Sequence, residues 1–340
     1  MITDILEMAG ASGATNGSPA LLPPVTEVET VLVGFDFGAN QSCLLAGSPD
    51  ATDVAVSKVI PTVVGYVKDG IVAGAARILC GEEALRARPH VKLVAPFREG
   101  IIADPAAARD FLKRVRTLAD PTGTAEIRAV VGLPAKATDN FRDDVRRCAQ
   151  GIFDRILLLP EPFLAALGYR EDSRVGQSDY VDPVANSLFI DIGGGTSDLC
   201  LVQGDFPARE DQISIPFAGD AIDELMHEEL DRTYQNNGLT LELGDVIDRA
   251  CHALVDKIYP ALTTLIARSS PDSVVMLLQN IIVTGGGAQV RGLDTVLRKK
   301  LSDDGYESAK VKLAGQDFQR YVVVGALKAA RENQWEILLN

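Results

Sequence analysis

The stretch that decides the fold of this chain is Leu188–Val202, which reads LFIDIGGGTSDLCLV. An apolar run ends at Asp191, glycines follow, and a second apolar run returns, which predicts two buried strands joined by a tight turn. Glycine permits positive φ and close approach to a ligand, so successive N–H groups in such a turn can converge on phosphate oxygens. The carboxylate of Asp191 at the strand's end can hold a hydrated divalent cation. An ordinary hairpin turn explains the same glycines, and the stretch alone leaves both interpretations open.

The same pattern occurs once more, nearer the N-terminus. An apolar run at 31–35 leads through Asp36 and Gly38 into a second apolar run. Superposing the two stretches puts Asp36 on Asp191 and Gly38 on Gly193, which indicates an internal repeat of strand, carboxylate, turn and strand. We expect the two hairpins to face each other and to clasp a polyphosphate from both sides.

A further carboxylate and a third glycine cluster extend the pattern. The strand expected before Glu161 runs directly into a helix, so Glu161 lies where the carboxyl end of a strand meets a helix N-terminus. Ligands of α/β proteins bind in that crevice, although a carboxylate that only favours the helix dipole would stand in the same place. A third apolar run at 279–284 ends in Gly285, Gly286 and Gly287 and is expected to open a helix, whose free N–H groups suit a phosphate or a ribose.

Composition excludes several classes of protein. At 340 residues, with 46% hydrophobic and 24% charged residues, the chain is long enough for two domains with sizeable cores and is not disordered throughout. The net charge of -14 argues against a general nucleic-acid binder, which needs Lys and Arg to neutralise phosphates. The five cysteines have no CxxC spacing, so neither a disulfide framework nor a zinc site is indicated. We find no membrane-spanning run and no signal-peptide n-region, and expect a cytoplasmic protein without a transmembrane segment.

Three strand-to-glycine elements, with an aspartate at the first two and Glu161 between them, resemble the actin, Hsp70 and sugar-kinase superfamily over about residues 31–333. Within that superfamily, Asp36–Asn40 (DFGAN) and the stretch at 130–137 (VVGLPAKA) resemble bacterial actin-like filament proteins of the MreB and MamK types. The resemblance implies an α/β, actin-like ATPase fold, in which two RNase H-like lobes flank a nucleotide cleft.

The resemblance also implies roles for individual residues, with ATP or ADP and Mg²⁺ in the cleft. Glu161 would orient the attacking water, and Glu161 and Asp191 are the catalytic candidates. Asp36 and Asp191 would hold the water shell of the metal. The residues implied to contact the nucleotide are those of the first turn (Gly38, Ala39, Asn40), the second turn (Gly193, Gly194, Gly195, Thr196) and the nucleoside side (Gly219, Asp220, Gly285, Gly286, Gly287).

The expected organisation has four parts. Residues 1–30 form a tail, flexible or partner-docking, because their composition cannot bury much apolar area. Lobe I spans 31–183, with a subdomain IB insertion at about 58–97, and lobe II spans 184–325. Residues 326–340 form a helix and tail that return to lobe I. In one respect the chain departs from the family, since subdomain IIB is reduced or absent at about 235–244, which leaves the grip on adenine unspecified.

We therefore expect an ATP-binding cytoskeletal protein that polymerises head to tail and hydrolyses ATP slowly. Its partners would be further copies of itself and a cargo or organelle-linked adaptor, without direct contact to nucleic acid. An alternative is an actin-fold adaptor that binds nucleotide with little turnover and recruits partners. A sugar kinase is disfavoured because no further cleft carboxylate is placed as a sugar base, and an Hsp70-type chaperone would need a C-terminal substrate domain.

Overall fold

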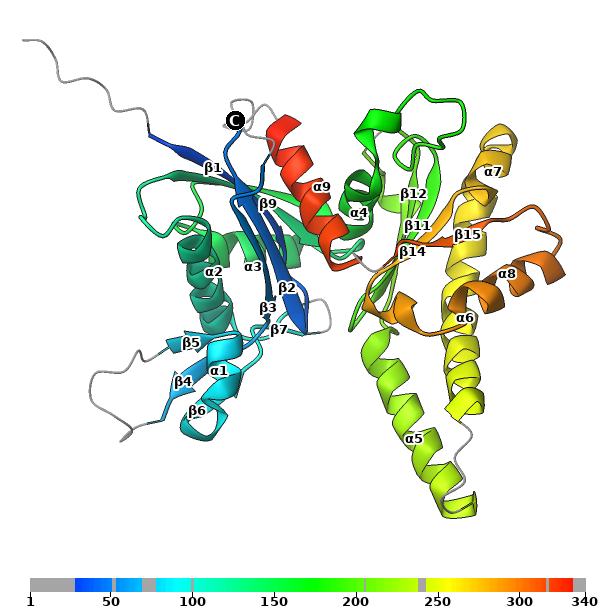
Figure 1. Cartoon of the computed structure of the whole chain (residues 1–340), viewed down its shortest axis with the longest axis horizontal. Coiled ribbons are helices and arrows are strands. Elements are labelled where there is room, and N and C mark those ends of the chain that lie inside the picture. The colour runs from blue at the N-terminus through cyan, green and yellow to red at the C-terminus, as the bar shows by residue number, and fades with distance from the viewer. Residues whose placement is uncertain are drawn as a thin grey trace, which may run out of the picture.

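Two five-stranded sheets face each other across a central pair of helices, and further helices cover their outer faces (Figure 1). The computed structural model describes residues 28–50, 53–68, 78–98, 101–204, 206–237, 243–315 and 318–332. Most of the expected N-terminal tail and the last residues of the expected C-terminal tail lie outside these ranges. None of the helices in the described ranges is long and apolar enough to cross a bilayer.

The first sheet, which defines lobe I, has the strand order β10-β9-β1-β2-β3. β2 is antiparallel to both β1 and β3, whereas β9 and β10 run parallel to β1 and complete the other half of the sheet. The strands are β1 (Thr30–Asp36), β2 (Gln41–Gly47), β3 (Val56–Pro61), β9 (Glu126–Leu133) and β10 (Arg155–Pro160).

The second sheet, which defines lobe II, repeats this arrangement with the order β13-β12-β11-β14-β15. Asp36 pairs with Cys43 in the first hairpin, and Asp191 pairs with Asp198 in the second. Each residue of the second pair lies 155 positions after its counterpart in the first (191 − 36 and 198 − 43). The internal repeat predicted from the sequence is confirmed down to its register. The strands are β11 (Ser187–Ile192), β12 (Ser197–Val202), β13 (Gln212–Ile215), β14 (Ile281–Thr284) and β15 (Val311–Leu313).

Helices on the outer faces close two separate hydrophobic cores. On lobe I, α2 (Pro105–Ala119) begins where the Asp104 carboxylate accepts the Ala107 N–H at 2.9 Å, and α3 (Asp139–Ala149) is capped by Thr138. Phe35, Phe111 and Ile127 lie in the core beneath them. The outer face of lobe II is covered by α5 (Gly219–Asn237), α6 (Leu243–Arg268), α7 (Pro271–Leu278) and α8 (Leu293–Asp303).

The central layer consists of α4 (Glu161–Tyr169) and α9 (Phe318–Glu332). α9 contacts β1, β2 and β9 of lobe I, while α4 contacts β11 and β12 of lobe II, and the two helices pack on each other. A third core of apolar side chains from both sheets and both helices fills this layer. The sequence placed the C-terminal helix only from residue 326 onward, whereas α9 begins at Phe318.

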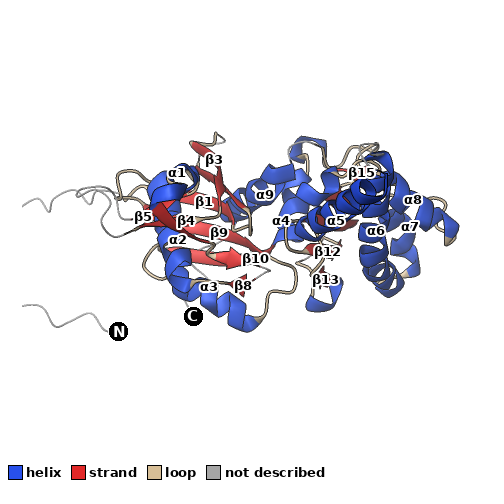
Figure 2. Ribbon diagram, turned by 90° about the horizontal axis from the view of Figure 1, so that it is seen from below, coloured by secondary structure: helices blue, strands red, loops and turns tan. Residues whose placement is uncertain are grey.

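A small three-stranded sheet projects from lobe I, beside α1 (Glu82–Arg86), at the end of the molecule seen at the left of Figure 2. Its strands are β4 (Val64–Val67), β5 (Ile78–Cys80) and β6 (Val91–Val94), and β7 (Phe97–Arg98) pairs with β8 (Ile101–Ile102) nearby. Residues 58–61, which were predicted to open an insertion, instead belong to β3 of the main sheet. Three-residue 3₁₀ turns lie at Arg88–His90, Asp172–Arg174 and Arg209–Asp211.

Candidate functional site

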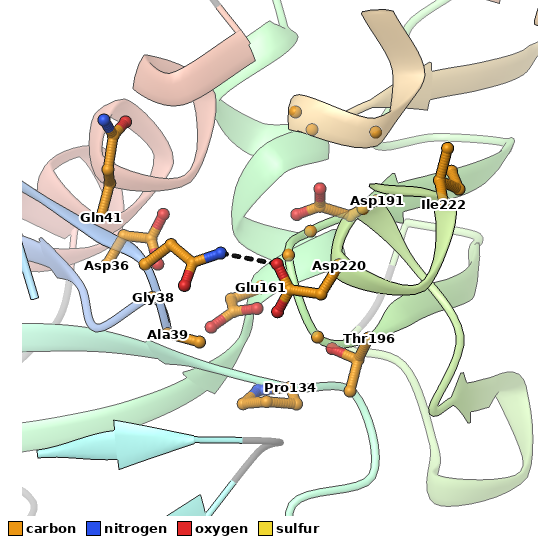
Figure 3. Close-up of a pocket in the computed structure, with 18 of the residues that line it drawn as sticks. Asp36, Gly38, Ala39, Gln41, Pro134, Glu161, Asp191, Thr196, Asp220 and Ile222 are labelled. Atoms are coloured by element: carbon orange, nitrogen blue, oxygen red, sulfur yellow. Dashed lines mark hydrogen bonds between the residues drawn. The ribbon is translucent and has the colours of Figure 1, made fainter. Parts of the chain in front are cut away.

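A cavity of about 380 Å³ lies between the lobes, within the size range of small-molecule sites. The turns of both hairpins, the start of α4, the start of α5 and the glycines after β14 meet there (Figure 3). The structure brings together in this one cavity every residue that the sequence singled out: Asp36, Gly38, Ala39, Asn40, Glu161, Asp191, Gly193, Gly194, Gly195, Thr196, Gly219, Asp220, Gly285, Gly286 and Gly287.

Three carboxylates converge at the floor of the cavity, and a fourth, Asp198, lies close by. Burial raises the pKa of Asp36 to about 7. Burial, followed by repulsion from Asp36 and Asp198, raises the pKa of Asp191 to about 8. The pKa of Glu161 is held well above its usual range by burial first and then by the neighbouring aspartates. Groups with such shifts in a cleft are typical of functional sites.

These carboxylates fit a divalent cation, because a cation between them would replace mutual repulsion with attraction. Hard cations such as Mg²⁺ take oxygen ligands and usually keep several waters, so that one or two carboxylates and the substrate's phosphates complete the shell. Within the described ranges, no group of three or more Asp, Glu, His or Cys side chains is arranged to hold a metal alone. The donor set therefore suits a hydrated cation that arrives with a phosphate ligand.

The sequence-based reasoning gave two reasons for the glycines of the two turns, positive φ and close approach of neighbouring atoms, and only the second holds. Neither Gly38 nor Gly193–Gly195 has a positive φ. A Cβ on Gly38 would overlap the carbonyl oxygen of Gln41, and one on Gly194 would lie 2.7 Å from Asn40 Nδ2. Gly285 does adopt φ 89°, and a Cβ there would lie 2.5 Å from Asp191 Oδ1. The glycines themselves form a short 3₁₀ turn at Gly286–Gln289, and the helix expected after β14 begins only at Leu293.

A hydrogen bond crosses the mouth of the cavity from lobe to lobe. Asn40 Nδ2 donates to Asp220 Oδ1 at 2.8 Å, the interaction drawn as a dashed line in Figure 3. Each side of this bridge has a fixed backbone: Asn40 O accepts the Thr62 N–H at 2.9 Å, and the Asp220 N–H donates to Gly194 O at 2.9 Å. The first turn, the second turn and the start of α5 thus meet at one point above the carboxylates.

A glycine in lobe I makes room for Glu161. Gly132 pairs with Asp36 across β9 and β1. A Cβ on Gly132 would lie 3.0 Å from Glu161 Cγ and 2.9 Å from Val322 Cγ1. The missing side chain therefore lets the first residue of α4 bring its carboxylate beside Asp36.

Sequence reasoning missed part of this site. Asp198 lies on β12, where its carboxylate accepts the Ala135 N–H at 3.1 Å and the Thr196 hydroxyl at 2.8 Å. The register of the repeat could have indicated it, because Asp198 pairs directly with Asp191. The first turns of α5 also line the cavity, where the sequence named only the two N-terminal residues. The other lining residues not predicted are Gln41, Cys43, Phe97, Pro134, Ile222, Asp223, Met226, Val290 and Val322.

Comparison with known proteins places this geometry among relatives. Residues 60–244, just over half of the chain, match the family model described as MreB/Mbl protein. Actin-like protein MamK of Paramagnetospirillum magneticum is 25% identical over 80% of this chain and 84% of its own length. A solved MamK double helical filament has a TM-score of 0.74 at 25% identity and covers 89% of this chain and 99% of its own. A non-polymerising MamK mutant bound to AMPPNP has a TM-score of 0.68 at 25% identity, with 90% and 100% coverage.

Proposed function

Because the chain belongs to the MreB/Mbl protein family, we propose that it binds ATP with Mg²⁺ in the cleft between its lobes. We further propose that it assembles head to tail into filaments and hydrolyses the bound ATP slowly. The filament would act in the cytoplasm to position or segregate an organelle or another cargo through an adaptor. The MamK relatives support this assignment, since one is described as a double helical filament and another as bound to AMPPNP.

The observation that carries the proposal is the convergence of two phosphate-type turns and three partly buried carboxylates in one cavity. Glycine turns of this kind would present backbone N–H groups to a polyphosphate, and both turns line the cavity. Asp36 and Asp191 would hold the water shell of the cation, which supplies charge neutralisation for the transferring phosphoryl group.

Glu161 would orient the attacking water and accept its proton. Its carboxylate is raised in pKa by burial, which makes it a better base at neutral pH than an exposed glutamate once a cation favours its ionised form. Its position is held by α4 on one side and by the space over Gly132 on the other. Phosphoryl transfer asks for little covalent chemistry from the protein, so positioning of this kind accounts for a slow ATPase.

Sedimentation with ATP, measured together with phosphate release, tests assembly and hydrolysis separately. Glu161→Ala should still form pelletable polymer, release phosphate about 100-fold more slowly, and prolong polymer lifetime. Asp139→Ala is the matched control, because Asp139 is also the first residue of its helix but does not line the cavity. Phosphate release that is unchanged in Glu161→Ala would remove Glu161 from the catalytic role.

The alternative function is an actin-fold adaptor with little turnover. It is favoured by the short connection between α5 and α6, because only residues 238–242 separate these helices where related proteins carry subdomain IIB. A wild-type protein that binds ATP but never sediments over a wide concentration range would favour the adaptor and exclude the filament.

A further inference from the structure

Thr284 carries a buried hydroxyl without a partner. Its side chain is 2% exposed, and Oγ1 makes no hydrogen bond within the described part of the chain. Burying a hydroxyl without a hydrogen bond destabilises the folded state, because the desolvated group gains nothing in return. A group of this kind beside a candidate site calls for a functional explanation, because a valine of the same shape would avoid that cost.

The register of the second sheet puts this hydroxyl beside Asp191. β14 runs parallel to β11, and Thr284 is the direct partner of Asp191. Side chains alternate between faces along a strand. Ile282 and Phe189 belong to the core between the lobes, whereas Val283 and Ile190 belong to the outer core. Two residues further along their strands, Thr284 and Asp191 must both face the space between the lobes.

The register places Thr284 and Asp191 on directly adjacent strands. Adjacent strands lie about 4.8 Å apart, and the threonine hydroxyl can reach a neighbouring staggered position by rotation about Cα–Cβ. The Asp191 carboxylate lies close to the residue after Thr284, since a Cβ on Gly285 would be 2.5 Å from Asp191 Oδ1. The Asp191 carboxylate is therefore the acceptor that this neighbourhood offers to the Thr284 hydroxyl.

The equivalent position in lobe I shows that this threonine is not required by the fold. Asp36 corresponds to Asp191, and its partner on the neighbouring parallel strand is Gly132, not a threonine. At that position lobe I uses the space for Glu161. The same place in the repeat thus admits the catalytic candidate in one lobe and carries a free hydroxyl in the other.

We propose that Thr284 is a positioning residue for Asp191. Its hydroxyl donates a hydrogen bond to the ionised Asp191 carboxylate when a divalent cation and a nucleotide occupy the cleft, and it orients that carboxylate toward the water shell of the cation. The inference rests on the proposed binding of Mg-ATP. Partners of this kind, which orient a metal-binding carboxylate, typically contribute 10- to 100-fold to metal affinity.

Thr284→Val and Thr284→Ser test the inference in the full-length protein. Binding of a fluorescent ATP analogue is measured in EDTA and then as Mg²⁺ is added, and thermal unfolding is measured without metal or nucleotide. Thr284→Val should shift the Mg²⁺ midpoint about 10-fold upward, while analogue binding in EDTA stays within about twofold of wild type. The same variant should raise the metal-free Tm by about 2–4 °C, because an unpartnered hydroxyl is removed.

Thr284→Ser keeps the hydroxyl and should bring the Mg²⁺ midpoint back to within about twofold of wild type, even if its Tm falls through loss of the methyl group. A Thr284→Val midpoint equal to wild type, a serine variant as weak as the valine variant, or a metal-free Tm that falls in Thr284→Val would each overturn the inference. If Mg²⁺ does not affect analogue binding by wild type, the proposed cation arrangement itself fails, and the two failures are thereby distinguished.

Discussion

Replacing Gly325 by alanine should destabilise the protein, because α9 crosses α4 without room for a methyl group. A Cβ on Gly325 would lie 2.7 Å from the carbonyl carbon of Leu164, 2.9 Å from Gly168 N, and nearer still to the Leu164 oxygen. All three atoms belong to the backbone, so no side-chain rotation can relieve the contact. The helices would have to separate by about 1.5 Å to regain ordinary contact distances.

The size of the effect follows from two opposing contributions. Alanine favours the helical conformation over glycine by about 1 kcal/mol. Overpacking costs about 1–3 kcal/mol or more, and a gap of about 0.5–1 Å loses a quarter to a half of the dispersion energy across the faces that it opens. Leu164, Val323 and Leu327 are buried between these helices and the two sheets, so separation disturbs both lobes. Because the contacted atoms are rigid backbone, the overpacking cost lies at the upper end of its range, and we expect a net loss of about 2 kcal/mol or more in the free energy of unfolding, with a Tm lower by at least about 4 °C.

Urea titration and thermal unfolding of Gly325→Ala measure this loss, with Gly244→Ala as the control. Gly244 also lies in a helix, but a Cβ there would have no neighbour within 4 Å, so this variant should be as stable as wild type or slightly more stable. Glu161 opens α4, and its displacement should also slow phosphate release in Gly325→Ala. If Gly325→Ala proves as stable as Gly244→Ala, the two helices do not pack as described and the explanation of the central layer is wrong.

Three further predictions concern the cleft. In the metal-free protein, burial raises the pKa of Asp36 to about 7 and that of Asp191 to about 8, above the usual 3.8, so the folded state retains protons on both. The free energy of unfolding should therefore fall as pH rises from about 4 to 8, by about 1.4 kcal/mol per pKa unit for each carboxyl. Asp191→Asn should flatten that profile in urea titrations, and an equally steep profile would contradict the assignment. Nucleotide dissociation rates are compared for Asn40→Ala, Asp220→Ala and the double variant, and the coupling energy derived from them should be about 0.5–1.5 kcal/mol. Additive effects would mean that the hydrogen bond between Asn40 and Asp220 does not restrain the lobes. Gly194→Ala should weaken nucleotide binding at least about 10-fold by displacing the Asn40 carboxamide, and unchanged affinity would show that this turn does not approach the phosphates.

The sequence was sufficient for the parts of the site that are local. Each hairpin is a continuous stretch in which strand, carboxylate and glycine turn follow one another, so the pattern itself specifies the geometry. The position of Glu161 could be predicted for the same reason, because the end of a strand and the start of a helix are adjacent in the chain. The repeat then indicated that these local pieces face one another, as they do in the cavity.

Features that depend on pairing between distant segments were not predicted. Thr284 gains its neighbour Asp191 only through the register of β14 on β11, which lie about 90 residues apart. β15 has only three residues and no strong alternation, and α7 is a short helix that the apolar pattern did not separate from the strand after it. The lining of the cavity by Ile222 and Met226 follows from how α5 is docked, since Gly219 N donates to Gly193 O at 3.0 Å.

The repeat is symmetric in its backbone and asymmetric in its chemistry, and this asymmetry explains how one cleft could both hold a cation and activate a water. At corresponding positions lobe I has Cys43 where lobe II has Asp198, and both polar bridges described across the cleft run from a lobe I donor to a lobe II carboxylate. Lobe II therefore concentrates the acceptors on which closure of the lobes depends. Lobe I, with a glycine in place of Thr284, has the space that admits Glu161. Any motion that separates the lobes would break both bridges and move Glu161 away from Asp191, so hydrolysis should depend on closure even where nucleotide binding does not.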